Sequence, residues 1–206
     1  MPNRTEVLLA TGNRHKLREI REMLEGTSYQ VLSLSEIKDP PEIIEDGDTF
    51  RANADKKART LAELSGRITI ADDSGIEVDA LDGAPGVYSA RFAGHSGEGA
   101  DDANNRLLLE KLRDVPNEKR TARFRCALAI VHPDGRSVYS DGTLEGKINY
   151  QEIGDNGFGY DPLFVVLEDS QGRTTAEMSS EEKNGISHRG RALTKLLPLL
   201  DELIGS

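Results

Sequence analysis

The chain has 206 residues, of which 36 are acidic and 26 basic, so its formal net charge is −10. This length suits one compact domain, or two lobes that share a sheet, and excludes several independent domains. The negative charge argues against a DNA or RNA polymer as a partner, although a few local cations could still hold a small anionic substrate. The only cysteine cannot form an internal disulfide, and no apolar run approaches the roughly 18 residues of a membrane helix. We therefore expect a cytoplasmic protein that binds neither a nucleic-acid polymer nor a membrane.

The first half of the chain alternates predicted strands with predicted helices, which is the pattern of an α/β fold. The expected elements are a strand at residues 6–10, a helix with Leu17, Ile20 and Leu24 on one face, a strand at 29–34, an acidic loop at 36–48, a helix at 49–64 capped by Asp48 or Thr49, and a strand at 67–72. The last strand has a continuous apolar centre, which is typical of a strand covered on both faces.

The second half predicts a hairpin between two helices. The expected elements are a loop-rich stretch at residues 82–100, a helix capped by Asp101 or Asp102 that carries Leu107, Leu108 and Leu112, a half-buried strand from Ala122 onward, a turn at 132–135, an antiparallel strand at 137–143, and a helix at 187–204 with Pro198 as a kink. Together the elements predict a mixed central sheet flanked by helices. We find no repeat or linker, so residues 1–206 are expected to form a single domain.

The segment between the first strand and the first helix is a candidate phosphate site. Free backbone N–H groups and the helix dipole favour an anion at a helix N-terminus, glycine allows close approach, and lysine adds charge. The segment is not a Walker A loop, because the second glycine and the Lys-Ser/Thr pair are absent. An ordinary helix-capping turn explains the same residues equally well. The candidate residues are Thr11, Gly12, Asn13, Arg14, His15 and Lys16.

The acidic segment Asp72-Asp73-Ser74-Gly75 is expected to form a turn at the carboxyl end of the 67–72 strand. Ligands bind at this end of the strands in open α/β sheets. Adjacent carboxylates can bind Mg²⁺, and one of them could also orient or deprotonate a water. A solvated turn is the commoner fate of such a sequence when it stands alone.

Acidic residues in the 36–48 loop could complete a metal site, although a solvated loop explains them as well. The candidates there are Glu42, Glu45, Asp46 and Asp48. On the helix that follows, Asn53 and Lys57 are four residues apart and share a face.

Two later segments could contact a nucleotide. One combines aromatic rings, a flexible glycine and a carboxylate, which suit stacking on a base and hydrogen bonding to its edge. The other supplies donors near the start of the last helix. A turn that packs its rings into the core, and ordinary helix-end charges, are the alternatives. The candidates are Phe158, Gly159, Tyr160 and Asp161 in the first segment, and Lys183, His188 and Arg189 in the second.

Four segments occur together in a fixed order: TGNRHK at 11–16, ADDSGIEVDALDGAPGVYSARFAG at 71–94, FGYDPLF at 158–164 and EEKNGISHRGRAL at 181–193. Over about residues 7–200 they resemble the non-canonical purine NTP pyrophosphatases, also called inosine triphosphatases or the Ham1 family. The resemblance implies hydrolysis of ITP, dITP and XTP to the monophosphate and pyrophosphate, with Mg²⁺, by a homodimer. It also implies an elongated ITPase-like α/β fold in which two lobes flank an active-site cleft.

The resemblance also implies roles for individual residues. Residues 11–16 would hold the phosphates, and Asp73 would be both metal ligand and proton acceptor. Glu45 would be the second metal ligand, with Asp46 or Glu42 as alternatives. Ser74 would touch the substrate. The nucleotide pocket would consist of Phe158, Gly159, Tyr160, Asp161, Lys183, His188 and Arg189, and Asn53, Lys57 and Asp72 would support the site. In the mechanism that we expect, Arg189 and the backbone near His188 could donate to O6 of a 6-keto purine. Lys16, Lys57 and Lys183 would stabilise the leaving pyrophosphate.

Two other functions would use similar residues. A metal-dependent nucleotidyl or glycosyl transferase also needs acidic metal ligands and a nucleotide pocket. A non-catalytic nucleotide-binding regulator would keep the pocket without turnover. The products of a triphosphate incubated without an acceptor distinguish these alternatives from hydrolysis.

Overall fold

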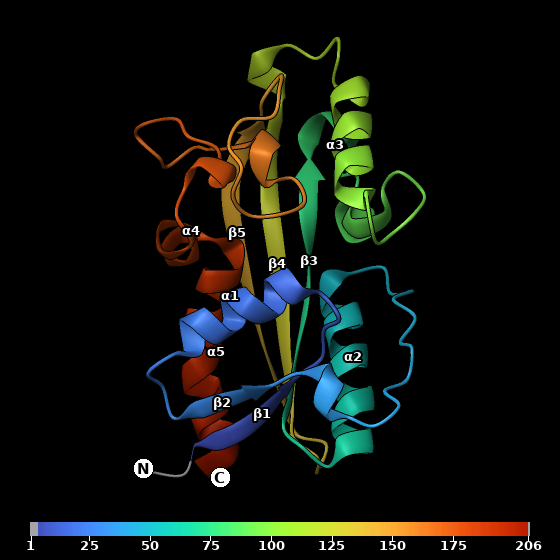
Figure 1. Ribbon diagram of the computed structural model, residues 1–206, viewed down its shortest axis with the longest axis vertical. Coiled ribbons are helices and arrows are strands. Elements are labelled where there is room, and N and C mark those ends of the chain that lie inside the picture. The colour runs from blue at the N-terminus through green and yellow to red at the C-terminus, as the bar shows by residue number, and fades with distance from the viewer. Residues whose placement is uncertain (1–3, 206) are drawn as a thin grey trace. The chain divides into compact units, whose positions relative to one another are not determined.

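A computed structural model describes residues 4–205, and in this range the strands form one six-stranded sheet of order β2-β1-β3-β4-β5-β6 (Figure 1). The strands are β1 (Thr5–Leu9), β2 (Tyr29–Leu32), β3 (Thr69–Val78), β4 (Thr121–Val131), β5 (Ser137–Ile148) and β6 (Phe164–Val166). The helices are α1 (Arg14–Leu24), α2 (Phe50–Ser65), α3 (Ala100–Lys111), α4 (Ser180–Ile186) and α5 (His188–Gly205). Because β1 is parallel to β2 and β3 while β5 is antiparallel to β6, the predicted mixed α/β sheet is confirmed.

The chain divides into two compact units, and it passes between them more than once. The first unit contains the residues up to Asp73, Cys126–Gly142 and the residues from Arg189 on. The second contains Ser74–Arg125 and Thr143–His188. Strands β3, β4 and β5 therefore each contribute residues to both units.

The first unit has three layers, with α1 and α5 on one face of its strands and α2 on the other. Val7 of β1 packs in the same cluster as Ile20 of α1 and Leu196 of α5. Its neighbour Leu8 points to the opposite face and packs in the cluster that contains Ala58 of α2. Because successive side chains of a strand alternate between faces, β1 needs an unbroken apolar run to fill both layers.

The two helices that begin the first unit start where the sequence indicates. The Asn13 side chain caps α1 and the Thr49 side chain caps α2, which settles the choice between Asp48 and Thr49. Helix α2 ends at Gly66, whose φ of 63° lies in the left-handed region that glycine occupies without steric cost.

The second unit has its own core, in which the rings of Phe124 and Phe164 lie 4.2 Å apart between centroids. Helix α3 of this unit was predicted to begin at an aspartate cap, Asp101 or Asp102, and this prediction is wrong. The N-cap is Gly99, with a φ of 74°, and Asp101 and Asp102 lie in the first turn, where negative charge still favours the helix dipole.

One strand differs from its prediction, and two short elements were not predicted. Strand β4 alternates buried and half-buried residues only up to Arg125, and from Cys126 onward both of its faces are covered. Short elements α4 and β6 were not predicted, although the capping box of Ser179 and Glu182 marks the start of α4 in the sequence. Across residues 4–205, no helix is both long enough and apolar enough to cross a membrane.

The hydroxyl of buried Tyr29 donates a hydrogen bond to Asp201 of α5. Burial and the Asp201 carboxylate raise the pKa of Tyr29 from 10 to about 12. A raised pKa stabilises the fold fully below the unfolded value of about 10, and this contribution is lost as pH rises through the folded value. Tyr29→Phe should therefore flatten the loss of stability above pH ~10, measured as the urea midpoint against pH. Tyr88→Phe, at a tyrosine that is 58% exposed, serves as the control and should keep the wild-type slope.

Candidate active site

The sequence predicted that the acidic segment 72–75 forms a turn at the end of a strand, but in the structure the segment lies within a strand. Strand β3 continues from Thr69 to Val78, straight through Asp72, Asp73 and Ser74. Its parallel neighbour β1 is the element that stops: Leu9 pairs with Ile70, and the Ala10 N–H donates to the Ile70 carbonyl before the chain turns into the 11–13 loop. The expected position at the carboxyl end of a parallel strand is thus supplied by β1.

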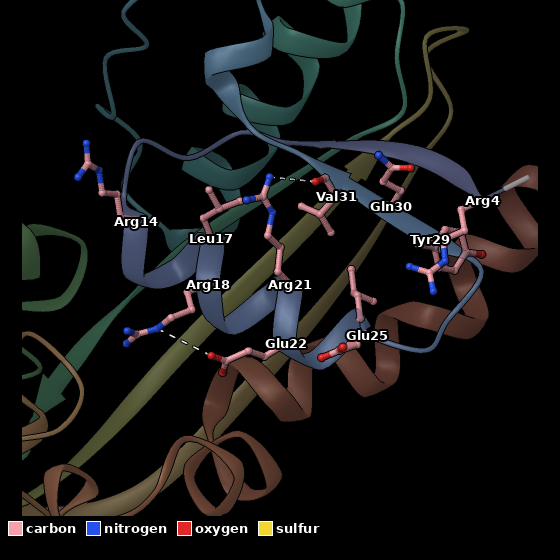
Figure 2. Close-up of a pocket in the computed structure, with 11 residues that line it drawn as sticks. Arg4, Arg14, Leu17, Arg18, Arg21, Glu22, Glu25, Tyr29, Gln30 and Val31 are labelled. Atoms are coloured by element: carbon pink, nitrogen blue, oxygen red, sulfur yellow. Dashed lines mark hydrogen bonds and ion pairs between the residues drawn. The ribbon is translucent and has the colours of Figure 1, made fainter.

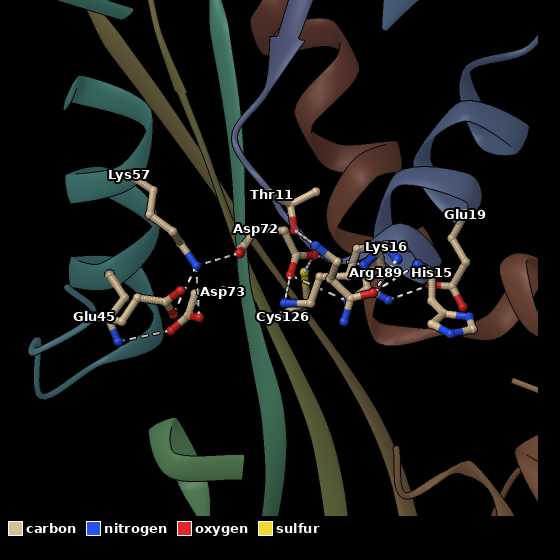
Figure 3. Close-up of polar contacts among 12 residues, drawn as sticks. Thr11, His15, Lys16, Glu19, Glu45, Lys57, Asp72, Asp73, Cys126 and Arg189 are labelled. Carbon is tan, nitrogen blue, oxygen red and sulfur yellow. Dashed lines mark hydrogen bonds and ion pairs between the residues drawn. The ribbon is translucent and has the colours of Figure 1, made fainter. Parts of the chain in front are cut away.

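Because β3 stays extended, its two aspartates point to opposite faces (Figure 3). Asp73 points to the α2 side, where it meets Lys57 and Glu45. Asp72 points to the side of α1 and α5. The two adjacent carboxylates therefore do not share one metal ion, which corrects the sequence interpretation that Asp72 and Asp73 together would suffice.

The cluster around Asp73 is centred on the Lys57 ammonium, which contacts two carboxylates and one backbone carbonyl. The Lys57 ammonium lies 3.1 Å from Asp73 Oδ1, 3.1 Å from Glu45 Oε2 and 2.9 Å from the Asp72 carbonyl oxygen. Asn53 donates from Nδ2 to Asp73 Oδ2 at 3.1 Å. The predicted pairing of Asn53 and Lys57 on one face of α2 is confirmed, and that face points at Asp73.

Asn53 also fixes the loop that carries Glu45. Its Oδ1 accepts from the Gly47 N–H at 2.8 Å, and a Cβ at Gly47 would lie 2.7 Å from that oxygen. The glycine therefore permits the close approach of the loop to α2, two residues beyond Glu45. Glu45 is the acid that reaches Lys57, whereas Asp46 turns to Lys56 on the outside of the helix, 2.6 Å away.

The pKa values of Asp73 and Glu45 are shifted in opposite directions. Burial raises the pKa of Asp73 to about 6 against the opposing charges of Lys57 and Lys16, and a hydrogen bond with Glu45 adds to the rise. Burial acts in the same direction on Glu45, but the Lys57 charge outweighs it and lowers the pKa of Glu45. Burial would lower the pKa of Lys57, but the nearby carboxylates of Asp73, Glu45 and Asp72 outweigh it and raise this pKa.

This donor set fits a magnesium ion. Mg²⁺ binds hard oxygen ligands and commonly uses only one or two protein carboxylates, with water and phosphate oxygens completing its shell. Glu45 and Asp73 are two such carboxylates within hydrogen-bonding reach of each other. Among residues 4–205 no group of three or more His, Cys, Asp or Glu side chains is arranged to hold a metal. Water and phosphate oxygens would complete the shell of an ion held by two carboxylates.

On the opposite face of β3, Asp72 is the centre of a buried charge network (Figure 3). Its Oδ1 lies 2.5 Å from Lys16 Nζ, and its Oδ2 accepts from Arg189 Nε at 2.8 Å. Arg189 Nη1 in turn lies 2.5 Å from Glu19 Oε2 of α1. The Cys126 thiol also donates to Asp72, at 3.2 Å. The network links β3, β4, α1 and α5 at one point.

The network keeps its acid and base charged despite burial. Burial alone would raise the pKa of Asp72, but the charges of Arg189 and Lys16 hold it well below its usual value. Arg189 is only 1% exposed, and Asp72 and Glu19 raise its pKa against the effect of burial. Burial, reinforced by Asp72, raises the pKa of the Cys126 thiol well above its usual value.

The 11–16 segment forms a helix-capping turn, and its role as a phosphate site stays a prediction. The Asn13 side chain accepts from the backbone N–H groups of His15 and Lys16, at 2.9 and 3.1 Å, so the segment is a capping turn. Lys16 nonetheless points to Asp72. Arg14 lies elsewhere, on a surface pocket of about 480 Å³ between α1 and β2 that Arg18 and Arg21 also line (Figure 2).

The second unit gathers the other predicted residues around Asp161, which is 2% exposed. Its carboxylate accepts from the Phe158 N–H at 2.8 Å, from Lys183 Nζ at 2.6 Å and from Thr175 Oγ1 at 2.8 Å. The Lys183 ammonium lies 4.9 Å from the centroid of the Phe158 ring. A Cβ at Gly157 would lie 2.1 Å from Asp161 Oδ2, so glycine is required where the loop closes over this carboxylate.

The structure separates the remaining candidates by environment. Tyr160 is 6% exposed and donates its hydroxyl to the Ser89 carbonyl, so this ring packs into the core, as the alternative interpretation of the segment proposed. The His188 ring stacks on Phe124, with centroids 4.9 Å apart. Ser74 is half-buried in β3. The site roles of these residues stay predictions.

Comparison with known proteins agrees with the predicted resemblance. Residues 7–199 match the Ham1 family. The chain belongs to the Ham1 family. A dITP/XTP pyrophosphatase of Desulforamulus reducens is 52% identical to it over 96% of this chain and 96% of its own. One of Exiguobacterium sibiricum is 49% identical over 97% of this chain and 99% of its own.

Solved Ham1 structures share the fold. A HAM1 protein from Coxiella burnetii superposes with a TM-score of 0.84 at 39% identity, covering 96% of this chain and 99% of that one. A nucleoside-triphosphatase / dITP/XTP pyrophosphatase from Mycobacterium abscessus gives a TM-score of 0.75 at 44% identity, covering 95% and 100%. The chain therefore shares its α/β fold with these two proteins.

Two side chains of this Ham1 site were missed by sequence reasoning. Glu19 is 5% exposed and pairs with Arg189, which lies 170 positions later in the chain, so no local pattern links the two. Thr175 holds Asp161 and stands outside the motifs that carry the resemblance. The signal for Glu19 is weak: it is an acidic residue directly before the buried Ile20 on an amphipathic helix.

Gly75 of the Ham1 sequence block is required by close packing. A Cβ there would lie 2.3 Å from Ser89 Oγ and 2.6 Å from the Gly86 carbonyl oxygen. Ser89 Oγ accepts from the Ile76 N–H at 2.9 Å, so the intrusion would break a buried contact of β3. Gly75→Ala should lower the free energy of unfolding by about 1–3 kcal/mol, measured by urea denaturation. Gly185→Ala is the matched control, since its Cβ would meet no atom within 4 Å, and it should not destabilise the protein.

Proposed function

We propose that this Ham1 protein hydrolyses dITP, ITP and XTP to the nucleoside monophosphate and pyrophosphate, with residues 1–206 acting as one domain. The observation that carries the proposal is the cluster of Asp73, Glu45 and Lys57, which joins paired carboxylates to a buried cation. The relatives named dITP/XTP pyrophosphatase support the substrate class, because they cover nearly the whole chain at about half identity.

Glu45 and Asp73 would hold Mg²⁺. When bound, the cation would neutralise part of the triphosphate charge and act as a Lewis acid on its phosphoryl oxygens. The carboxylates are held in place for this by Asn53 and Lys57. Asp46 is directed at Lys56 and is the weaker candidate for the second ligand.

Asp73 would accept the proton from the water that attacks the α-phosphorus. Its carboxylate is oriented by Asn53 and Lys57, so little rearrangement is needed at the moment of reaction. Lys16 and Lys57 would stabilise the charge that accumulates on the departing pyrophosphate, since both ammonium groups are mostly buried and fixed by carboxylates.

The cluster of the second unit would recognise the nucleobase. Phe158 offers an aromatic face, and Lys183 a donor whose position Asp161 fixes. Arg189 was expected to donate to O6 of the purine, but its guanidinium donates to Asp72 and Glu19. We therefore propose that Arg189 acts by holding Asp72, and that Lys183 and His188 supply the donors for a 6-keto group.

The proposal includes a cytoplasmic homodimer: the single cysteine favours the first feature, and the second rests on the family resemblance. A size measurement in solution tests the second: a particle of twice 22.6 kDa is expected, and a monomer would contradict it.

A panel of nucleoside triphosphates tests reaction, metal and base together. Pyrophosphate release should be fast for dITP, ITP and XTP and slower by on the order of 10²-fold or more for dATP, because an adenine 6-amino group meets donors that a 6-keto group would satisfy. Chelation of Mg²⁺ should stop it. Equal kcat/KM for dITP and dATP would contradict the proposed selectivity. Release only with an added acceptor would favour a transferase, and binding without release would favour a regulator.

A further inference from the structure

Helix α3 holds both backbone groups of Gly159, the middle of the loop 157–161. The Gly159 N–H donates to Asp101 Oδ2 at 2.8 Å, and the Gly159 carbonyl accepts from Asn105 Nδ2 at 3.0 Å. Asp101 and Asn105 are four residues apart on α3 and therefore share one face of the helix. Two side chains one helical turn apart on α3 thus bind the N–H and the carbonyl of one residue, Gly159.

The loop needs this support because of its backbone. Gly159 has a φ of 61°, in the left-handed region, and Gly157 has a φ of 79°. Glycine gains more conformational freedom than other residues when it is released, so a loop with two glycines keeps one shape only if contacts fix it. Asp161 supplies contacts on one side of the loop, at the Phe158 N–H. The α3 side chains supply those of Gly159.

The burial of Asn105 has an energetic cost, because one of its polar atoms loses water without gaining a protein partner within residues 4–205. It is 3% exposed, and in the described part of the chain its Oδ1 has no hydrogen-bond partner. A buried acceptor without a donor is unfavourable, so the residue is explained by what its Nδ2 does. The contact made by Nδ2 is the one to the Gly159 carbonyl.

A second route ties the same helix to the same loop. Asn104 donates to the Ser89 carbonyl at 3.2 Å, and the Tyr160 hydroxyl donates to that same carbonyl at 2.8 Å. Asn104 Oδ1 also accepts from the Ala93 N–H at 2.8 Å. The residue after Gly159 is therefore fixed through Ser89, so loss of one α3 contact changes the position of the loop without releasing it from the core.

We propose that Asp101 and Asn105 are positioning residues for nucleobase recognition: by fixing Gly159 they set the place of the Phe158 ring and so the affinity and base selectivity of the enzyme. This inference rests on the proposed function, since it assigns the loop to the base of a purine triphosphate. Neither side chain is expected to touch the reacting atoms. Their loss should therefore act on substrate binding and leave the chemical step in place.

The matched pair Asp101→Ala and Asp102→Ala tests the proposal. Both residues are exposed, carry the same charge and lie in the first turn of α3, so the two changes alter the helix dipole interaction alike. Only Asp101 contacts the loop. Asp101→Ala should raise KM for dITP on the order of tenfold, as expected for one lost charge-assisted hydrogen bond, with kcat within about twofold. The preference for dITP over dATP should fall, and Asp102→Ala should match wild type.

Two further variants separate positioning from general destabilisation. Asp101→Asn keeps an oxygen that can accept from the Gly159 N–H, so it should restore most of the wild-type KM. Asn105→Asp has the same shape but replaces the donor with a carboxylate facing the Gly159 carbonyl, so it should raise KM while the melting temperature shows that the protein is folded. If KM and base preference are unchanged in both Asp101→Ala and Asn105→Asp, the proposal is wrong.

A readout that needs no activity keeps this inference distinct from the proposed function. Amide hydrogen exchange in residues 157–161 should accelerate in Asp101→Ala and stay at the wild-type rate in Asp102→Ala. Unchanged exchange would overturn the structural part of the inference. Wild-type protein that releases no pyrophosphate from dITP would instead overturn the proposed function, whatever the exchange result.

Discussion

Asp73→Asn is expected to lower kcat for pyrophosphate release from dITP by about 10³-fold, because the variant loses both a metal ligand charge and the proton acceptor. Asparagine has the same shape as aspartate, and its single oxygen can still accept from either Asn53 or Lys57, which donate to different oxygens of Asp73, so the protein should stay folded. Nucleotide binding should therefore remain measurable by calorimetry. Steady-state kinetics with saturating Mg²⁺ measures the effect.

Asp114→Asn provides the control for this variant. Asp114 is exposed, and the same charge is removed there without touching the cluster, so wild-type kcat is expected. Turnover by Asp73→Asn at the wild-type rate would show that Asp73 neither binds the metal nor takes the proton. Loss of nucleotide binding in the variant would show that Asp73 contributes to binding the substrate and not only to the chemical step.

Arg189→Gln is expected to cost about 3–5 kcal/mol of unfolding free energy, since removing one partner of a buried ion pair leaves uncompensated charge. Two carboxylates would be left in the interior: Asp72, which is 1% exposed, and Glu19, which is 5% exposed. Lys16 would still neutralise one of them. Urea denaturation followed by circular dichroism gives the free energy, provided that the slope of the transition is unchanged.

Arg18→Gln is the matched control for the stability measurement. The Arg18 side chain is 56% exposed and lies 3.9 Å from Glu22, so its removal should change the unfolding free energy by less than about 0.5 kcal/mol. A loss below about 1 kcal/mol in Arg189→Gln would mean that the buried network contributes little to the stability of the fold.

The elements of the first unit were predictable because local rules and tertiary packing agree there. The apolar spacing of Leu17, Ile20 and Leu24 gives α1, and the Thr49 cap gives the start of α2. Among the site residues, the pairing of Asn53 with Lys57 follows from helix geometry alone. In each case, the decisive information lies within a few residues of sequence.

The errors arise where the structure depends on distant partners. Asp72 and Asp73 look like a turn, but neighbouring strands keep β3 extended and send the two carboxylates to opposite faces. The sequence could not show that the Arg189 guanidinium donates to Glu19 and Asp72, and its role toward a base stays a prediction. Polar sequence signals could not distinguish a charge that binds a ligand from one that is neutralised within the core.

The position of Cys126 makes the only thiol of this chain a reporter on the charge network. The group is buried, donates to Asp72, and has a pKa held well above its usual value, so alkylating reagents meet no thiolate while the network is closed. Labelling of Cys126 therefore requires Asp72, Arg189 and their neighbours to separate, and its rate rises with the population of the open state. Alkylation of this one natural thiol therefore reports the opening of the charge network without an engineered label.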